Sequence, residues 1–427
     1  MARLFTCGAE IEVTTPSAVE LQISQGTPSR DTSVFRSGLA SFKCNSGASN
    51  SAEFLQLTGT QVGSGSDLIA ISQTTISRAY FNFGAAPGST VQVMTSGSGP
   101  TPTLTGGQGI SACLTSTGKL QLFNNVTGAQ IGSDSNATLV MDGTTWYRIE
   151  ISITINAGSQ INSCELRLDG VTVASATGLT ISISGFMLFG WLLAPGANKS
   201  CWIDDVAVND ASGASQNSWP DSGKVVLLLP TADSAVGTSW TDSGGASTNL
   251  FDSINNTPPI GIADTIANAG HQIRNAGSAT SSYDATMTTY SAAGISSADT
   301  INVLVPLINV GAPVSTQAKT GSYGVASNPT ITNIAFVKGV SSDFWRGSAA
   351  GTYQTGWGWE KGTVTYSPSV TVGTAPVARV TITGGSSSRI AMADFMGIYV
   401  DYTPAPAVSD VPDINRRTPR RRTLQRM

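Results

Sequence analysis

Residues 145 to 210 show the clearest alternation of apolar and polar positions in the chain. Isoleucine occupies every second position from 149 to 155, with polar or charged residues between. Because successive strand residues point to opposite faces of a sheet, this alternation predicts a strand with one face in a core and the other in water. Such a strand is typical of an antiparallel β-sandwich.

The sequence ELRLDGVTVA, which begins at Glu165, predicts a tight β-hairpin. Its central Asp169-Gly170 can supply the two positive φ angles of a two-residue turn, which then sets the register of the two strands. The apolar cross-strand pairs predicted on one face are Leu168 with Val171 and Leu166 with Val173.

Similar short runs of apolar and β-branched residues predict strands along most of the chain. In the run 301–307, alternate residues predict one buried face, while Pro306 lacks a backbone donor and indicates an edge strand or a bulge. We therefore predict an all-β protein built as two sandwiches. The main further strands are expected at 4–13, 36–43, 79–83, 91–94, 118–123, 202–208, 225–229, 332–339, 377–383 and 396–402.

Length and composition agree with this fold class and divide the chain. The 427 residues include 46 glycines and only 12% charged residues, as expected for short strands joined by many turns. A polar Gly/Ser/Pro stretch at 213–224 predicts a linker between a first domain, 1–212, and a second sandwich, 225–403. Residues 404–427 are rich in proline and arginine without apolar periodicity, which predicts an extended tail.

The order of several motifs resembles a known domain. These are CGAEIE, RSGLASFK, RAYFNF before a proline turn, GKLQLF, IGSDSNATL, WYRIEI, ELRLDGVTVA and CWIDDVAVND. In this order they resemble the laminin-G-like, concanavalin A-type jelly-roll domain of bacteriophage virion proteins, over about half of the chain. QNSWPDSGKVVLLLP resembles the junction to a second β domain in phage tail and virion proteins. The fainter matches in the second half are DSINNTPP, AGISSADTINVLV and GIYVDY.

The resemblance implies a structural protein of the virion, made in the host cytoplasm, and not an enzyme. It would be a minor tail protein, a fibre-associated subunit or a head-decoration protein. Its partners would be capsid or tail subunits and further copies of itself, a trimer being one such assembly. Attachment to host surface glycans would be a second role. A carbohydrate-binding lectin module and a concanavalin-type glycan hydrolase are the alternatives.

The residue inventory argues against catalysis and against a membrane span. The single histidine, His271, has no nucleophile motif beside it. Glu165 and Asp169 share a strand face about 13 Å apart, farther than the ~5–10 Å of paired glycosidase carboxylates. The longest apolar run, 186–194, is too short to cross a bilayer.

The five cysteines have no CxxC spacing, which predicts small buried thiols of a reducing compartment. A Cys164–Cys201 disulfide is the alternative.

Asp204 and Asp205 end the jelly-roll part of the chain. Related laminin-G-like domains sometimes bind calcium at the sandwich rim, so these residues are candidate calcium ligands, and no other cofactor is expected. Adjacent strand residues point to opposite faces, so only one of them would serve without a bend. The alternative is that both carboxylates cap loop amides.

Aromatic residues gather between 344 and 359, and alternation places Trp357 and Trp359 on one face. Exposed, such rings would contact a partner subunit or stack on sugars; buried, they would belong to the core. The candidate contact residues are Trp345, Tyr353, Trp357 and Trp359.

Six arginines make the C-terminal tail strongly basic. Without these six charges the formal net charge of −4 would be −10. We expect a docking arm for an acidic protein surface, because guanidinium groups grip carboxylates in pairs. A merely solvated end and nucleic-acid binding are the alternatives; the latter is disfavoured since no aromatic residues are interleaved. The arm residues are Arg416, Arg417, Arg420, Arg421, Arg422 and Arg426.

Overall fold

The computed structural model confirms the all-β fold class. In the residues that it describes, no α-helix occurs, and a single 3₁₀ helix, η2, spans Leu250–Ser253. All strand pairings there are antiparallel and form four sheets. The described residues are 3–11, 20–57, 74–99, 102–242, 244–255, 272–275, 277, 279–311, 321–325, 334–336, 358–361, 364–368, 370–382 and 391–406.

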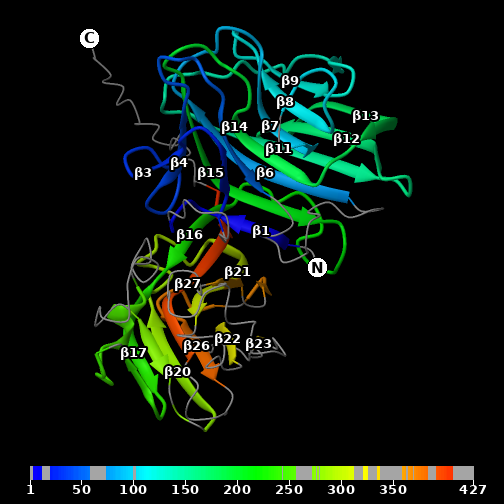
Figure 1. Cartoon of the computed structure of the whole chain (residues 1–427). Coiled ribbons are helices and arrows are strands. Elements are labelled where there is room, and N and C mark those ends of the chain that lie inside the picture. Colours follow the sequence, from blue (N-terminus) through cyan, green and yellow to red (C-terminus); the bar gives the residue numbers. More distant parts are fainter. Residues whose placement is uncertain are drawn as a thin grey trace, which may run out of the picture.

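Two of these sheets face each other as the first sandwich, a jelly-roll unit (Figure 1). The first sheet has the described strand order β13 (Val171–Ser182), β12 (Gln160–Leu168), β11 (Trp146–Ile155), β6 (Thr74–Phe83), β15 (Ser200–Asp210), β4 (Ser41–Asn45) and β3 (Ser29–Asp31), with β1 (Arg3–Cys7) also on β15. The second has the described order β10 (Ala129–Ile131), β9 (Leu120–Asn124), β8 (Ile110–Leu114), β7 (Val91–Ser98), β14 (Phe186–Trp191), β5 (Glu53–Leu57) and β2 (Gln22–Gln25).

The second sandwich follows along the chain and lies below the first in Figure 1. Its larger sheet has the described order β18 (Trp240–Asp242), β19 (Ile273–Asn275), β27 (Ala391–Thr403), β21 (Thr300–Gly311) and β24 (Gly358–Lys361), with β16 (Lys224–Leu228) on β27 and β25 (Thr365–Tyr366) on β21. Its smaller sheet runs β17 (Pro230–Val236), β20 (Ser281–Met287), β26 (Val377–Ile382), β22 (Gly321–Val325) and β23 (Ile334–Phe336). The domain limits inferred from composition stay a prediction.

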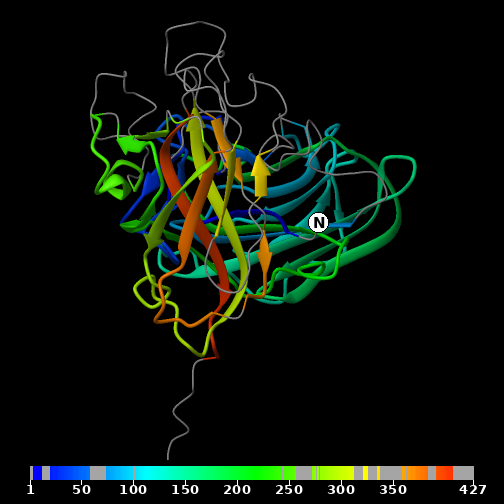
Figure 2. The same cartoon turned by 90° about the horizontal axis from the view of Figure 1, so that it is seen from below.

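Each sandwich has its own apolar core. The alternating isoleucines at 149–155 all lie in the first core, which confirms the strand predicted there. In the second sandwich, residues 396, 398, 400 and 402 of β27 share the core face, as their spacing predicts. β27 and β21 lie side by side through the middle of this unit, seen from below in Figure 2.

The predicted hairpin is confirmed in its turn and corrected in its register. Asp169 and Gly170 both have positive φ, at 51° and 84°, and Leu168 lies opposite Val171. Leu166, however, pairs with Ala174 and not with Val173. An extra residue in β13 forms a bulge at this point, and a period-two pattern cannot register such an insertion.

The 301–307 strand is also corrected in two respects. A register shift between Ile301 and Val303 turns Ile301 toward the second core, whereas Val303 belongs to a separate cluster. The strand is also not at an edge, because β21 lies between β27 and the pair β24 and β25. Pro306 is tolerated because β25 pairs only up to Leu304 and β24 only from Leu307, so no described strand needs its missing donor.

Candidate functional site at the junction of the two sandwiches

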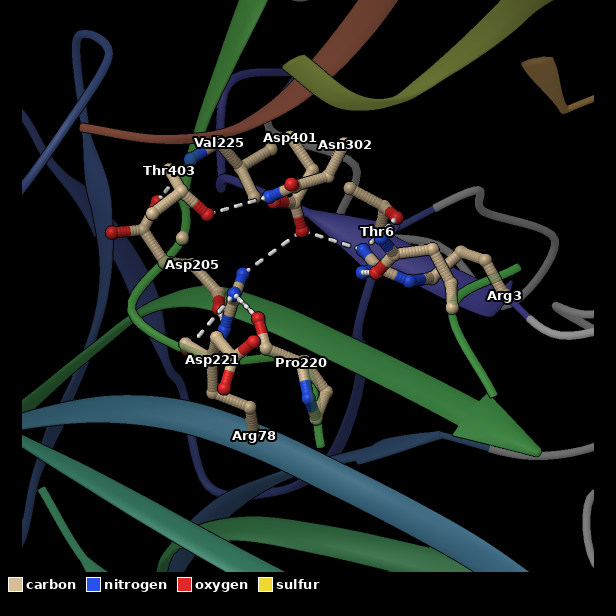
Figure 3. A network of polar contacts seen from close by, with 12 residues as sticks. Arg3, Thr6, Arg78, Asp205, Pro220, Asp221, Val225, Asn302, Asp401 and Thr403 are labelled. Atoms are coloured by element: carbon tan, nitrogen blue, oxygen red, sulfur yellow. Dashed lines mark hydrogen bonds and ion pairs between the residues drawn. The ribbon is translucent and has the colours of Figure 1, made fainter. Parts of the chain in front are cut away.

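Three buried charged side chains meet where the two sandwiches join (Figure 3). Arg78 stands on β6 and points away from the first core, which receives its neighbour Ala79. Asp401 stands on β27 of the second sandwich. Its Oδ2 accepts from Nη2 of Arg78 at 3.1 Å and from Nη1 of Arg3 at 2.5 Å. All three residues are at most 2% exposed, so the two halves are joined by ion pairs shielded from water.

The electrostatics of this cluster favour an ionised Asp401. Burial alone raises the pKa of its carboxyl, but the charges of Arg78 and Arg3 outweigh burial and hold the pKa below its usual value. Asn302 donates to the second carboxylate oxygen at 3.0 Å. Because arginine stays protonated, removal of this one carboxylate would leave two buried cations without a counter-charge.

The stretch predicted as a linker is held against the outer face of the first sheet. Arg78 Nη1 donates to the carbonyl of Pro220 at 2.8 Å, and Arg36 Nη1 donates to that of Gly223 at 2.9 Å. The Arg167 guanidinium lies 3.8 Å from the ring centroid of Trp219, a cation–π contact. These contacts with two backbone carbonyls and one indole ring hold the stretch in place, so it is not a free spacer.

The two candidate calcium ligands lie at an irregular point of β15. The register shifts between Asp204 and Ala207, and Asp205 has a φ of 50°. Both carboxylates consequently reach the same loop, at Arg36 and Ser37, where a regular strand would send them to opposite faces.

Each oxygen of this acidic pair accepts a hydrogen bond. Asp204 accepts from the backbone N–H groups of Arg36, at 2.8 Å, and of Asp205, at 2.7 Å. Asp205 accepts from the Arg36 guanidinium, the Ser37 hydroxyl and the Val225 N–H. Burial, with the neighbouring Asp205, raises the pKa of Asp204 well above its usual value. These contacts match the loop-capping alternative, and calcium binding here stays a prediction.

A second set of contacts between the two sandwiches involves two buried glutamates. The Tyr399 hydroxyl, from β27, donates to Oε1 of Glu20, which also accepts the Ile11 N–H at 3.0 Å. Both oxygens of Glu10 accept the Leu39 N–H at 3.0 Å. Burial raises the pKa of Glu10 to about 8 and also raises those of Glu20 and Tyr399. Ile11 adds an apolar contact to residues of the second sandwich.

Charged residues also line the outer face of the first sheet. Glu150 lies opposite Arg78 on one side and opposite Arg167 on the other, and it pairs with Arg148 Nε at 3.3 Å. Burial raises its pKa to about 7, while the arginines oppose that rise. Arg148 Nε and one Glu150 oxygen are buried without a hydrogen bond.

The loop between β3 and β4 is rigidly anchored and presents apolar side chains to solvent. Its backbone N–H groups at Arg36 and Leu39 donate to carboxyl oxygens of Asp204 and Glu10. Phe35 is nevertheless 41% exposed and Leu39 64% exposed. The acidic pair thus fixes the position of a loop that carries two large exposed hydrophobic residues.

Most of the other predicted site residues lie outside the described part of the chain. Trp359 is the exception among the aromatic residues; its backbone lies in β24, opposite Asn309. The residues outside are Trp345, Tyr353, Trp357, Arg416, Arg417, Arg420, Arg421, Arg422, Arg426 and His271.

Sequence reasoning missed the residues that form the junction, namely Arg3, Arg78, Asp401 and Glu10. One signal was available, because Arg78 and Asp401 each stand within an apolar strand, in SRAYFNF and GIYVDY. A lone charge in such a run needs a buried partner. The partner could not be identified, since Arg78 and Asp401 are more than 300 positions apart along the chain.

The fold is that of a two-sandwich β protein, and the buried ion pairs of Asp401 with Arg3 and Arg78 lie where the two sandwiches join. In the described residues, no group of three His, Cys, Asp or Glu side chains could hold a metal ion. No helix there has the length and apolar character needed to span a bilayer.

Comparison with known proteins returned distant structural similarities. No family model and no curated protein sequence matches the chain. Among solved structures, the cellulose-induced protein Cip1 is 19% identical, over 43% of this chain and 86% of that one, with a TM-score of 0.32. A carbohydrate esterase of the Shiga toxin-encoding bacteriophage phi24B is 14% identical, over 48% and 98%, with a TM-score of 0.32. The botulinum neurotoxin type G receptor-binding domain is 12% identical, over 45% of this chain and 43% of that one, with a TM-score of 0.29. Similarities this low have no bearing on function.

Proposed function

We propose that this chain is a non-enzymatic structural protein of a bacteriophage virion, made in the host cytoplasm and assembled as a tail, fibre-associated or head-decoration subunit. The observation that carries the proposal is the ordered motif set from CGAEIE to CWIDDVAVND, followed by QNSWPDSGKVVLLLP. Its support is the resemblance of that order to phage virion proteins.

The junction fits a protein that must hold two modules in a fixed relation. Asp401 pairs with Arg3 and Arg78 inside the joint, and the intervening stretch is hydrogen-bonded to the sheet. Breaking such pairs is costly because charges would remain buried without partners. A rigid two-sandwich body can transmit position between neighbouring subunits, as a spacer or display element requires.

The loop between β3 and β4 is our proposed subunit contact. Exposed aromatic and aliphatic side chains anchor many protein interfaces, and a loop that is already ordered loses little entropy on binding. Phe35 and Leu39 meet both conditions, since Asp204 and Glu10 hold their loop. The aromatic residues at 344–359 and the arginine arm are further contact candidates, and assembly into a homo-oligomer such as a trimer belongs to the same proposal.

Mass spectrometry of purified particles tests this function. We expect the chain in fixed stoichiometry with the major capsid or tail proteins. Complementation with F35S/L39S should lower its incorporation several-fold, while V126S/V140S, at two other exposed valines, should incorporate normally. Absence of the chain from washed particles would refute the virion proposal. Normal incorporation of F35S/L39S would refute the loop contact alone.

Carbohydrate binding is the second candidate and rests on the outer face of the first sheet. There the half-buried Trp219 ring packs against the Arg167 guanidinium. Aromatic rings beside polar groups suit sugar recognition. A glycan array with and without calcium, run with W219A in parallel, tests this role. A signal lost in W219A would favour it, and turnover of the bound glycan would favour the hydrolase alternative.

A further inference from the structure

Two of the five cysteines lie directly opposite each other on neighbouring strands. Cys44 of β4 and Cys201 of β15 are partners in the antiparallel register. Both are fully buried and both belong to the first core, and their side chains lie on the same face of the sheet. The two sulfur atoms therefore face each other in an apolar environment.

The backbone geometry at this pair is compatible with a disulfide. Two positions along the same ladder, the Ser46 N–H donates to the carbonyl of Lys199 at 2.9 Å. Antiparallel pairs alternate in type, so Cys44 and Cys201 also form a hydrogen-bonded pair, with an expected Cα separation of about 5.5 Å. Disulfides bridge Cα separations of about 4.4–6.8 Å.

The other three cysteines have no such neighbour. Cys7 lies opposite Val206, Cys113 opposite Gln92 and Gln121, and Cys164 opposite Ile153 and Ala176. All five are buried free thiols, as predicted from their spacing. Cys201 faces Cys44, and the Cys164–Cys201 alternative has no support from the register. Only one cross-strand cysteine pair therefore exists among the five.

We propose that Cys44 and Cys201 form a redox pair, a dithiol in a reducing cytosol and a cross-strand disulfide once the protein meets an oxidising medium. The oxidant is a small-molecule disulfide. The thiolate of one cysteine attacks a sulfur of that disulfide, breaks its S–S bond and releases one thiolate. The second cysteine thiolate then attacks the mixed disulfide, which forms the Cys44–Cys201 bond and releases the second thiolate. Two protein thiols are thereby oxidised, and one disulfide is reduced to two thiols.

The fold determines when this exchange can occur. Burial and the adjacent Cys44 raise the pKa of the Cys201 thiol well above its usual value, so the folded chain offers little thiolate. Both sulfur atoms are also inaccessible to a reagent in solution. We therefore expect thiol–disulfide exchange at Cys44 and Cys201 only when this part of the fold opens locally or while the chain refolds. The bond would tie β4, which begins directly after the anchored loop, to β15, which carries Asp204 and Asp205.

Refolding under defined redox conditions tests the pair. The full chain is unfolded in urea and refolded in a mixture of oxidised and reduced glutathione; free thiols are then alkylated under denaturing conditions and disulfide-linked peptides are mapped by mass spectrometry. We expect three of the five thiols to remain free, a linked Cys44–Cys201 peptide, and a Tm higher than that of protein refolded in dithiothreitol. C44A should keep all its thiols free, whereas C113A should still form the bond. Five free thiols in the refolded protein, or a bond between any other two cysteines, would overturn the proposal.

Discussion

Arg78 and Asp401 form a fully buried ion pair, 3.1 Å long, between a central strand of the first sandwich and the last described strand of the second. The same carboxylate oxygen also binds Arg3. The Asp401 side chain thus joins β1, the first sheet and the second sandwich, so its substitution should disturb all three.

Replacing this carboxylate should destabilise the protein strongly. D401N leaves Arg3 and Arg78 buried without a counter-charge, so we expect a loss of about 3–5 kcal/mol in the free energy of unfolding, measured by urea denaturation. E165Q is the matched control, because it breaks the partly exposed pair with Arg167 and should cost at most about 1 kcal/mol. Equal losses in the two variants would contradict the role assigned to Asp401.

The buried glutamates should make stability fall as pH rises. The pKa of Glu10 is about 8 in the folded protein and near its ordinary value in the unfolded chain. Between about pH 4.5 and 8 the folded state therefore keeps a proton that the unfolded state releases. The contribution of Glu10 to the free energy of unfolding is therefore full below about pH 4.5. It falls by up to about 1.4 kcal/mol for each pH unit within this range and is lost above pH 8.

Thermal unfolding across pH 5–9 checks this linkage. E10Q removes the titrating group and should flatten the decline of Tm. E10Q/E150Q should flatten it further, because the pKa of Glu150 is raised to about 7. If E10Q shows the same pH profile as the unsubstituted chain, the carboxyl of Glu10 does not carry its proton in the folded state.

Gly38 should not tolerate a side chain. It has a φ of 64°, and an added Cβ would lie 1.7 Å from Oε1 of Glu10. Gly106 has a similar φ of 75° with open space around it, so G106A measures the backbone cost alone, about 1–2 kcal/mol. G38A must add to this the displacement of Glu10 from the Leu39 N–H. Chemical denaturation should therefore show a larger loss for G38A, and equal losses would mean that the loop adapts freely.

Calcium should leave stability unchanged at Asp204 and Asp205. Their four oxygens already accept hydrogen bonds, whereas Ca²⁺ needs six to eight oxygen ligands. We expect the same Tm in millimolar calcium as in EDTA. A saturable rise in Tm with calcium, absent in D204N, would establish a metal site there.

The sequence predicted those features well that depend only on neighbouring residues along the chain. The isoleucines of β11 and the turn at Asp169-Gly170 were readable because period and turn chemistry are local properties. The cross-strand partner of Leu166 and the face occupied by Ile301 could not be predicted, because each depends on a bulge. A bulge inserts one residue without leaving a compositional mark.

The candidate site was less predictable than the fold. Asp204 and Asp205 were singled out as possible ligands, yet their partners lie on the loop at Arg36 and Ser37 and on β16. Contacts between residues so far apart in sequence depend on the order of the strands in the sheets. This order cannot be read from the hydrophobic pattern of a single sequence. Glu10 gave no signal, because an acidic residue near the N-terminus is usually exposed.

The junction also restricts how such a chain can be recombined. A recombination crossover within 213–224 would separate Asp401 from Arg3 and Arg78. A hybrid that received an unrelated second module would inherit two buried arginines with nothing to neutralise them. The second sandwich with Asp401 should therefore be inherited together with the first sandwich that carries Arg3 and Arg78. A replacement of the second sandwich should be accompanied by replacement of the two arginines.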